Sequence, residues 1–149
     1  MDSIIISETD FQKARKKIRE ANKENKQVIF SSNDDDLNRK ILEKEEVNVL
    51  LINMSGRKDR MKQRDSGFNH VIAKLTKKKD VIIGINLDEI ISSRGKEKLE
   101  IIGRVRQNVK LCNKNKVKMK FISKEKCDIY NLKSLGLVLG MPTWMTKDL

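Results

Sequence analysis

The chain has 149 residues and a mass of 17.3 kDa, which is the size of one ordinary domain. We therefore expect residues 1–149 to form a single α/β domain, with a short C-terminal tail at 142–149. Its two cysteines, Cys112 and Cys127, are too few and too far apart for a zinc site or a disulfide scaffold. No apolar run approaches the roughly 20 residues that a membrane span requires, so we expect no membrane partner and a cytoplasmic location.

The charge is distributed unevenly along the sequence. Residues 1–56 contain 10 Lys and Arg against 11 Asp and Glu, whereas residues 57–149 contain 23 against 10. The whole excess of the net charge of +12 therefore follows Gly56. Counterion release favours many cationic contacts with phosphates, so a polyanion such as nucleic acid fits this pattern better than a small acidic substrate. The alternative interpretation is a set of solvated lysine faces without a partner.

Short apolar runs alternate with helical periodicity in the first third of the chain. The runs at 4–6 and 28–30 predict strands, and a helix is predicted over 11–25. Asn33 is a candidate N-cap for a second helix, whose first turn would hold three carboxylates, those of Asp34, Asp35 and Asp36. Consecutive residues on a helix diverge by about 100°, so these carboxylates are not expected to converge on a metal ion.

The same alternation continues through the rest of the chain. Strands are predicted at 47–52, 81–85 and 117–122, and a helix over 66–78 with Asp65 or Ser66 as its N-cap. A longer helix is predicted over 96–113, capped by Ser92 or Ser93, with one apolar stripe formed by Leu99, Ile102, Val105, Val109 and Cys112. A short helical turn at 132–135 and a sixth strand at 137–139 complete the predicted elements.

Strands that alternate with helices, with almost no hairpin signals, indicate right-handed βαβ units and a mainly parallel sheet. An open sheet and a barrel with strands missing both satisfy this pattern. A complete eight-stranded barrel usually takes about 250 residues, so composition does not choose between them.

A basic loop leads into the predicted helix over 66–78. Residues 57–64 carry five cations and one acid, a formal +4. Side-chain cations and unpaired backbone NH groups converge where such a loop meets a helix N-terminus, which is a place for phosphates. The candidate RNA-binding residues that this pattern indicates are Arg57, Lys58, Arg60, Lys62, Arg64, His70 and Lys74.

A second cationic group lies on the predicted helix over 96–113. Residues 94–120 hold 10 Lys and Arg against 2 Glu. We expect the face opposite the apolar stripe to carry Arg104, Gln107, Lys110 and Lys114, with Arg106 and Asn108 flanking it. This adds to the candidate RNA-binding residues Arg104, Arg106, Gln107, Asn108 and Lys110. Aromatic residues make up only 4% of the chain, so recognition of RNA backbone and shape is expected rather than base stacking on an aromatic platform.

The sequence offers little for catalysis by the protein itself. Its only histidine, His70, has Lys74 four residues further on, so it belongs to a basic face and is interpreted as a helix-capping or RNA-contacting residue. No nucleophile elbow, phosphate-binding loop or dinucleotide-binding motif is present. We therefore expect no catalytic residues and no metal ligands.

Five blocks of sequence together resemble a known family. They are Gln63–Leu75, Val81–Gly84, Gly103–Cys112, Lys116–Met119 and Leu137–Met141. In this order and spacing they closely resemble the protein component 3 family of archaeal ribonuclease P, the 30-kDa subunit family. The similarity extends from about Gly56 to Met141. By this resemblance the family's signature falls on Arg64, Asp65, Ser66, Gly67, Asn69, His70 and Lys74, and its second block on Arg104, Gln107 and Asn108. The resemblance thereby adds Ser66 and Asn69 to the candidate RNA-binding residues.

The resemblance implies a fold and a function. The family is similar to a TIM-like, metal-dependent-hydrolase-like barrel without metal ligands, and the short region before Val28 implies a shortened barrel that is open or completed by a partner. It implies a non-catalytic, RNA-binding subunit of an endoribonuclease ribonucleoprotein, in which the RNA removes the 5′ leader of precursor tRNA. The expected partners are ribonuclease P RNA, protein component 2 and, indirectly, precursor tRNA. No cofactor is expected on the chain, and Mg²⁺ is expected with the RNA subunit. The alternatives are a standalone metal-dependent phosphoesterase and a pure scaffold subunit.

Overall fold

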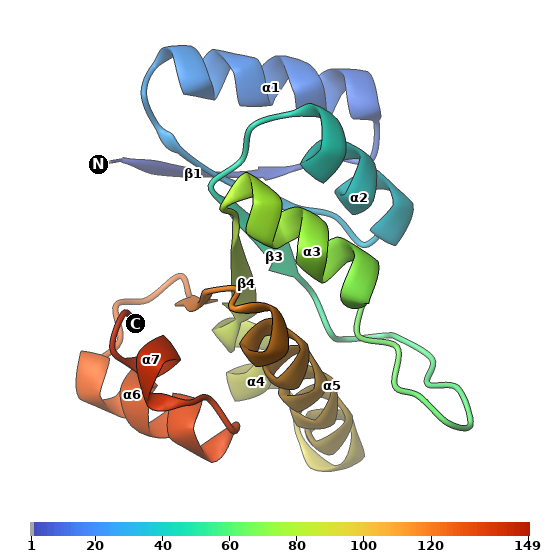
Figure 1. Cartoon of the computed structure of the whole chain (residues 1–149), viewed down its shortest axis with the longest axis vertical. Coiled ribbons are helices and arrows are strands. Elements are labelled where there is room, and N and C mark those ends of the chain that lie inside the picture. Colours follow the sequence, from blue (N-terminus) through green and yellow to red (C-terminus); the bar gives the residue numbers. More distant parts are fainter. Residues whose placement is uncertain (1) are drawn as a thin grey trace.

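The computed structural model describes residues 2–149 and contains one sheet of five parallel strands. The strands are β1 (Ser3–Ser7), β2 (Gln27–Ser31), β3 (Val49–Ile52), β4 (Ile82–Asn86) and β5 (Met119–Ile122), and they lie in the sheet in chain order. Because every connection is a crossover that advances by one strand in the same direction, the helices gather on one face of the sheet (Figure 1). The predicted α/β class is confirmed, and the sheet corresponds to an open part of a TIM-like barrel.

The helices follow the strands in a regular succession. They are α1 (Phe11–Lys23), α2 (Asp35–Lys44), α3 (His70–Lys79), α4 (Leu87–Ser92), α5 (Gly95–Asn115), α6 (Ile129–Val138) and α7 (Thr143–Thr146). Along the covered face α1 contacts α2, α2 contacts α3, and α3 contacts α5, so α3 and α5 lie side by side (Figure 1). Within residues 2–149 there is no helix long and apolar enough to cross a membrane.

The sheet is apolar on both faces. Alternate strand residues such as Leu50, Ile83 and Phe121 join the large core beneath the helices. On the other face Ile29, Val49 and Leu51 form a second, smaller buried cluster. Gly84 lies among them, and a Cβ added there would be 3.1 Å from Val49 Cγ1 and 3.2 Å from Leu51 Cδ1. Side chains of neighbouring strands thus converge on this face, as they do inside a barrel.

Lys120 occupies a strand position that is usually apolar. It lies on β5 opposite Gly84 of β4, so it belongs to the face that carries the smaller cluster. β5 is an edge strand that pairs only with β4, and the Lys120 side chain is exposed. A charged residue on an edge strand also discourages pairing with other chains.

Two predicted helix starts are wrong. Asp34, rather than Asn33, caps α2, because its Oδ1 accepts hydrogen bonds from the backbone NH groups of Asp36 and Leu37 at 3.0 and 3.4 Å. The third helix begins at His70, not after Asp65 or Ser66. Gly67 has a φ of +66°, which interrupts the helix, and Asn69 Oδ1 accepts from the backbone NH of Ile72 at 3.0 Å instead.

The region around Ser92 and Ser93 also differs from the prediction. A short helix, α4, occupies 87–92, and Asn86 caps it through a hydrogen bond to its Oδ1 from the Glu89 NH. Ser93 therefore ends α4 rather than beginning α5. α5 starts after Arg94 without a side-chain cap. Neither predicted serine cap forms.

The predicted sixth strand at 137–139 is wrong. Leu137 and Val138 are the last residues of α6, which begins at Ile129. Its Gly136 packs so closely that a Cβ would lie 3.0 Å from Met141 Sδ and 3.2 Å from Thr146 Cγ2. The residues from 142 onward include α7, and Met145 is buried, so this segment packs back onto α6.

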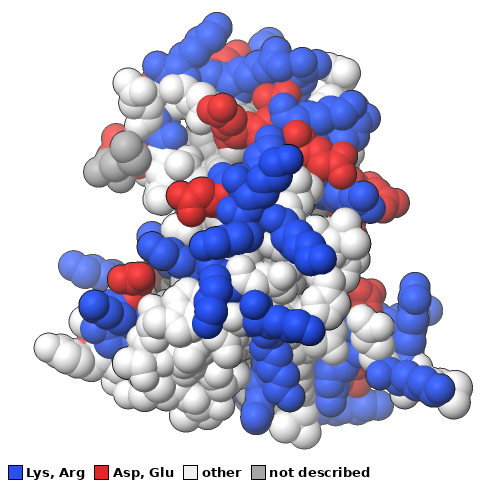
Figure 2. Space-filling model, viewed as in Figure 1, with Lys and Arg blue, Asp and Glu red and all other residues white. Residues whose placement is uncertain are grey.

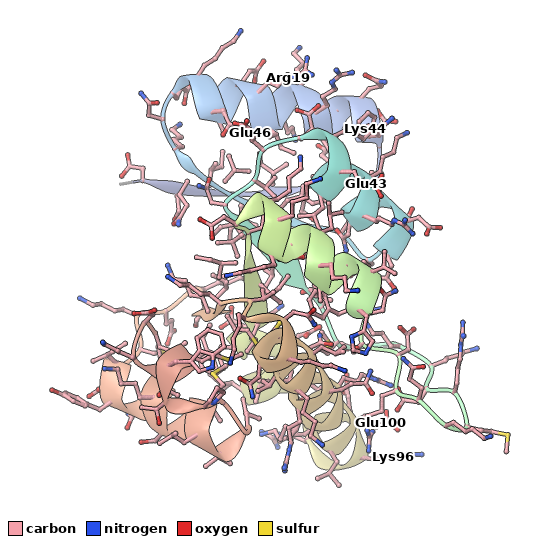
Figure 3. The ribbon with its side chains drawn as sticks, in the orientation of Figure 1. Arg19, Glu43, Lys44, Glu46, Lys96 and Glu100 are labelled. Carbon is pink, nitrogen blue, oxygen red and sulfur yellow. The ribbon has the colours of Figure 1, made fainter. Side chains whose placement is uncertain are left out.

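Buried Glu45 ties α2 to α1. Its side chain is 5% exposed, and its carboxylate lies 2.8 Å from Arg15 Nε and 3.3 Å from Arg19 Nε. Arg19 projects from α1 in Figure 3. Because two arginines neutralise this buried carboxylate, α1 and α2 are fixed relative to each other over β2.

The two thiols are predicted to react very differently. Cys112 is fully buried on α5, and burial raises the pKa of its thiol well above the usual range, whereas Cys127 is half-buried in a loop. In the native protein we expect one thiol per chain to react with a chromogenic disulfide reagent. The second should react only in denaturant, and equal reactivity of both thiols without denaturant would contradict this packing.

Candidate nucleic-acid interface

The longest connection at the carboxyl ends of the strands is the loop over 53–69, between β3 and α3. Glu89 of α4 holds its beginning, because its two carboxylate oxygens accept from the backbone NH groups of Met54 and Ser55 at 2.9 and 3.0 Å. Functional residues of TIM-like folds gather at this end of the sheet, because the loops there lie over the ends of several strands. The geometry of this loop therefore defines the candidate site.

Arg104 of α5 is the centre of the loop's hydrogen bonding. Its guanidinium is 2% exposed, and it donates from Nη1 to Met54 O at 2.8 Å, from Nη2 to Arg57 O at 2.8 Å and from Nε to Asp59 Oδ1 at 3.0 Å. Glu100, one turn earlier, places a carboxylate oxygen 3.8 Å from Nη2, and it is seen near the N-terminal end of α5 in Figure 3. One buried cation thus binds the first half of the loop to α5.

Asp59 joins the two halves of the loop. Its Oδ1 also accepts from the backbone NH of Asp65 at 3.0 Å, and its Oδ2 lies 3.4 Å from Arg64 Nη1. Burial acts to raise the pKa of Asp59, but the hydrogen bonds from Arg104 and the Asp65 NH, together with the charges of Arg104 and Arg64, lower it overall. The ionised form of Asp59 is therefore part of the folded loop.

Arg57 connects the loop to the start of α2. Its Nη1 and Nη2 form a bidentate pair with Asp35 at 2.8 and 3.0 Å, and Nη1 lies 3.2 Å from Asp65 Oδ1. The side chain is only 9% exposed. Gly67 lies against this pair: a Cβ there would be 2.6 Å from Arg57 Nη2, and its φ of +66° also favours glycine.

Amide side chains of α5 hold the second half of the loop. Gln107 Nε2 donates to Arg64 O at 2.9 Å and to Ser66 Oγ at 3.0 Å, and Asn108 Nδ2 donates to Ser66 O at 3.1 Å. Arg64 lies flat across α5 at Gly103, where a Cβ would be 2.7 Å from the guanidinium carbon. The loop therefore rests on α5 along its length.

The structure divides the sequence-predicted site residues into two groups. Five are buried or half-buried and form the hydrogen bonds that hold the loop in place: Arg57, Ser66, Arg104, Gln107 and Asn108. Nine are exposed and accessible to a partner: Lys58, Arg60, Lys62, Arg64, Asn69, His70, Lys74, Arg106 and Lys110.

The predicted faces of α5 are partly confirmed, because Val105, Val109 and Cys112 are buried as expected, and partly wrong. Arg104 and Asn108 are 2% and 1% exposed, whereas Leu99 of the predicted apolar stripe is 71% exposed. The prediction treated polar residues as exposed and apolar ones as buried. Here the buried side of α5 includes the polar residues that anchor the loop.

Exposed cations nevertheless converge on the neighbouring helices α3 and α5. Six of them, none within 4 Å of an acidic oxygen in residues 2–149, form what we call the α3–α5 basic face: Lys74, Lys77, Lys78, Arg106, Lys110 and Lys114. Figure 2 shows Lys and Arg side chains over α3 and α5 in the centre of the view and along the loop at the right. Lys77, Lys78 and Lys114 extend the predicted set of RNA-binding residues. The lysine run after His70 was the sequence signal for the first two, and the polar face of the long helix was the signal for Lys114.

The carboxyl ends of β2, β3 and β4 carry neutral polar groups. Asn86 Nδ2 donates to Asn53 Oδ1 at 2.9 Å, and Asn53 Nδ2 donates to Ser31 Oγ at 3.3 Å and Asn33 Oδ1 at 3.2 Å. Among residues 2–149, no three or more His, Cys, Asp or Glu side chains are grouped so that they could hold a metal ion. His70 is exposed at the first turn of α3. The arrangement offers cations and hydrogen-bond donors for an anionic partner.

Fold and site define the class of this chain as a TIM-like α/β protein with a rigid carboxyl-end loop and a basic outer face. Its curated relatives include proteins named Ribonuclease P protein component 3. The protein from Methanococcus maripaludis strain C7 is 27% identical over 143 residues, covering 96% of this chain and 57% of the relative. That from Methanococcus vannielii is 27% identical over 113 residues, covering 76% and 46%. These matches confirm the resemblance seen in the sequence.

A solved structure has the same fold. It is described as a cryo-EM structure of archaeal Ribonuclease P with mature tRNA, and a chain in it superposes with a TM-score of 0.75 at 20% identity. The superposition covers 97% of this chain and 62% of that one. No family model matches the chain. The chain spans about half the length of the curated relatives it matches.

Replacing Arg104 with Ala is predicted to destabilise the protein by about 2–4 kcal/mol, because Met54 O and Arg57 O lose buried donors. Arg106→Ala, two residues away on the exposed side of α5, should change the free energy of unfolding by no more than about 0.5 kcal/mol. Chemical denaturation of both variants checks this pair. Equal losses would show that the loop does not depend on Arg104.

The Asp59 carboxylate is predicted to titrate below its ordinary pKa of 3.8. A lowered folded-state pKa means that the ionised carboxylate stabilises the folded loop above pH 3.8, and this contribution is lost as the pH falls through the folded-state value. A carboxyl-carbon NMR titration of Asp59 measures the pKa directly. A value at or above 3.8 would contradict the hydrogen bonds assigned to Arg104 and the Asp65 NH.

Proposed function

We propose that this chain is an RNA-binding protein subunit of ribonuclease P that supports cleavage by the RNA subunit and does not itself cut precursor tRNA. The observation that carries the proposal is the match to the ribonuclease P protein component 3 of Methanococcus maripaludis strain C7 over 96% of the chain. The basic excess after Gly56 and the α3–α5 basic face support the RNA-binding part of it.

The physical basis of RNA binding would be electrostatic. Six exposed cations on two adjacent helices present a positively charged surface. Such a surface suits the phosphates of a folded RNA, whose spacing many lysines can follow without base-specific geometry. The partners in this proposal are ribonuclease P RNA and protein component 2, with precursor tRNA bound indirectly and Mg²⁺ held with the RNA.

The buried arginines would act indirectly. Arg57 and Arg104 have their donors occupied by protein acceptors, so they hold the loop in place rather than contacting phosphates. Lys58, Arg60 and Lys62 then project from a loop whose base is held by these hydrogen bonds. The proposal therefore separates residues that shape the surface from residues that touch RNA.

Reconstitution tests the proposal as a whole. The cognate ribonuclease P RNA, with component 2 and Mg²⁺, should remove the 5′ leader faster with this chain than without it. The chain alone should not cleave precursor tRNA with any divalent ion. Cleavage by the protein alone, together with stoichiometric bound metal in the purified chain, would favour a metal-dependent phosphoesterase instead. An unchanged rate on adding the chain would contradict the proposed role.

The salt dependence of RNA binding tests the surface. The double variant Lys110→Ala/Lys114→Ala should weaken binding and reduce the slope of log K against log salt by about 1 to 2, because each phosphate contact contributes about 0.7 to 0.9. The double variant Lys16→Ala/Lys23→Ala removes the same charge from exposed positions on α1. It should leave the slope nearly unchanged. The same salt slope for both double variants would show that the α3–α5 basic face does not contact the RNA.

A further inference from the structure

The tip of the basic loop is a tight turn that projects from the body of the protein. The backbone NH of Arg60 donates to Gln63 O at 2.9 Å, and the NH of Gln63 donates to Arg60 O at 3.4 Å. Met61 and Lys62 are therefore the two residues at the apex. Met61 is 103% exposed, so its whole side chain stands in solvent. Figure 1 shows this loop extending away from α5 and the rest of the fold.

The base of this turn is rigidly anchored. Asp59, immediately before it, is hydrogen-bonded to Arg104 and to the Asp65 NH. Arg64, immediately after it, lies across α5 at Gly103 and pairs with Asp59. The turn of 60–63 is thus held at both ends within one residue of its start and finish. A preordered tip loses little conformational entropy when it meets a partner.

Free cations surround the exposed methionine. Lys58, Arg60 and Lys62 are exposed, and none lies within 4 Å of an acidic oxygen in residues 2–149. Asp59 is the only acid from 57 to 64, and its carboxylate is already engaged by Arg104 and Arg64. The tip therefore presents one large apolar side chain between uncompensated positive charges.

This combination fits RNA better than a protein partner. Three cations within three residues of Met61 would meet phosphates on either side of a nucleotide, and a protein pocket would need a matching set of acids. Apolar side chains, methionine among them, insert against base steps in nucleic-acid complexes while nearby cations hold the backbone. The polarisable thioether also contacts aromatic rings favourably. RNA bases become accessible in this way chiefly in loops and bulges, where they are unstacked.

We propose that residues 58–63 form an RNA-contacting finger in which Met61 packs against an unstacked nucleobase and Lys58, Arg60 and Lys62 contact the flanking phosphates. This inference rests on the proposed function, because it requires that the chain binds structured RNA. It adds a base contact to a surface that otherwise recognises the RNA backbone. It also explains why the base of the loop is anchored, since Met61 and the cations can contact RNA together only if the base of the finger is fixed.

Affinity measured at several salt concentrations separates the base contact from the phosphate contacts. With cognate ribonuclease P RNA as the probe, Met61→Ala should weaken binding by about 3- to 10-fold with an unchanged salt slope, because no charge is removed. Lys62→Ala, the neighbouring residue, should weaken binding and reduce the slope by about 1. Val138→Ala, which truncates a 73% exposed apolar side chain on α6, is the matched control and should bind as the wild type does.

A fluorescent variant reports the contact directly. Met61→Trp should bind the same RNA with at least wild-type affinity, and its added emission should be quenched on binding because the indole stacks on a base. The wild-type chain, which contains only Trp144, provides the background. Because Met61 is fully exposed, we expect all these variants to unfold at the wild-type temperature.

The outcomes distinguish failure of the proposed finger from failure of the proposed function. If the wild-type chain binds the RNA and Met61→Ala binds equally well, with no quenching in Met61→Trp, the finger is overturned and the proposed function stands. If Met61→Ala instead weakens binding to component 2 and leaves RNA binding unchanged, the tip is a protein contact and the finger is again overturned. If the wild-type chain does not bind the RNA, both the finger and the proposed function fail.

Discussion

The buried guanidinium of Arg104 is the interaction on which the candidate interface depends. Residues 57–64 of the loop carry five cations and one acid, and they would not settle against a basic helix by electrostatics alone, since like charges repel one another. Arg104 overcomes this by donating to two backbone carbonyls and to Asp59, which lies 45 positions earlier in the sequence. Its burial is tolerated because each guanidinium nitrogen has an acceptor. The helix α5 thereby becomes the support for a loop that follows β3.

The cations of this protein serve two separate purposes. Buried Arg57 and Arg104 use the planar guanidinium to satisfy several acceptors at fixed angles, which lysine cannot do. The exposed α3–α5 basic face consists of five lysines and one arginine, flexible point charges that can follow phosphates of varying position. Under the proposed function, RNA binding and stability therefore rest on different residues, and loss of RNA binding can be measured in variants that still fold.

The fold was largely predictable from the sequence, and the roles of the site residues were not. Short β-branched runs separated by helical periodicity were enough to place all five strands, because buried parallel strands are continuous apolar runs. Helix starts were predicted wrongly where tertiary contacts decide them. Gly67 has a positive φ and lies so close to Arg57 and Asp35 that a Cβ would not fit there. The prediction of which side of α5 is exposed was wrong at Arg104 and Asn108 because both side chains are polar yet buried. Their acceptors come from a distant loop, which no local pattern reveals.

Tethered hydroxyl-radical probing of cognate ribonuclease P RNA tests the central claim most directly. An iron chelate would be attached to a cysteine at position 110 on α5 or at position 16 on α1, as Lys110→Cys or Lys16→Cys, each in a Cys127→Ser background. Cys112 is buried and stays unmodified. The account predicts localised RNA cleavage from position 110 and none from position 16. Cleavage from position 16 alone, or from neither position in a bound complex, would contradict RNA contact by the α3–α5 basic face.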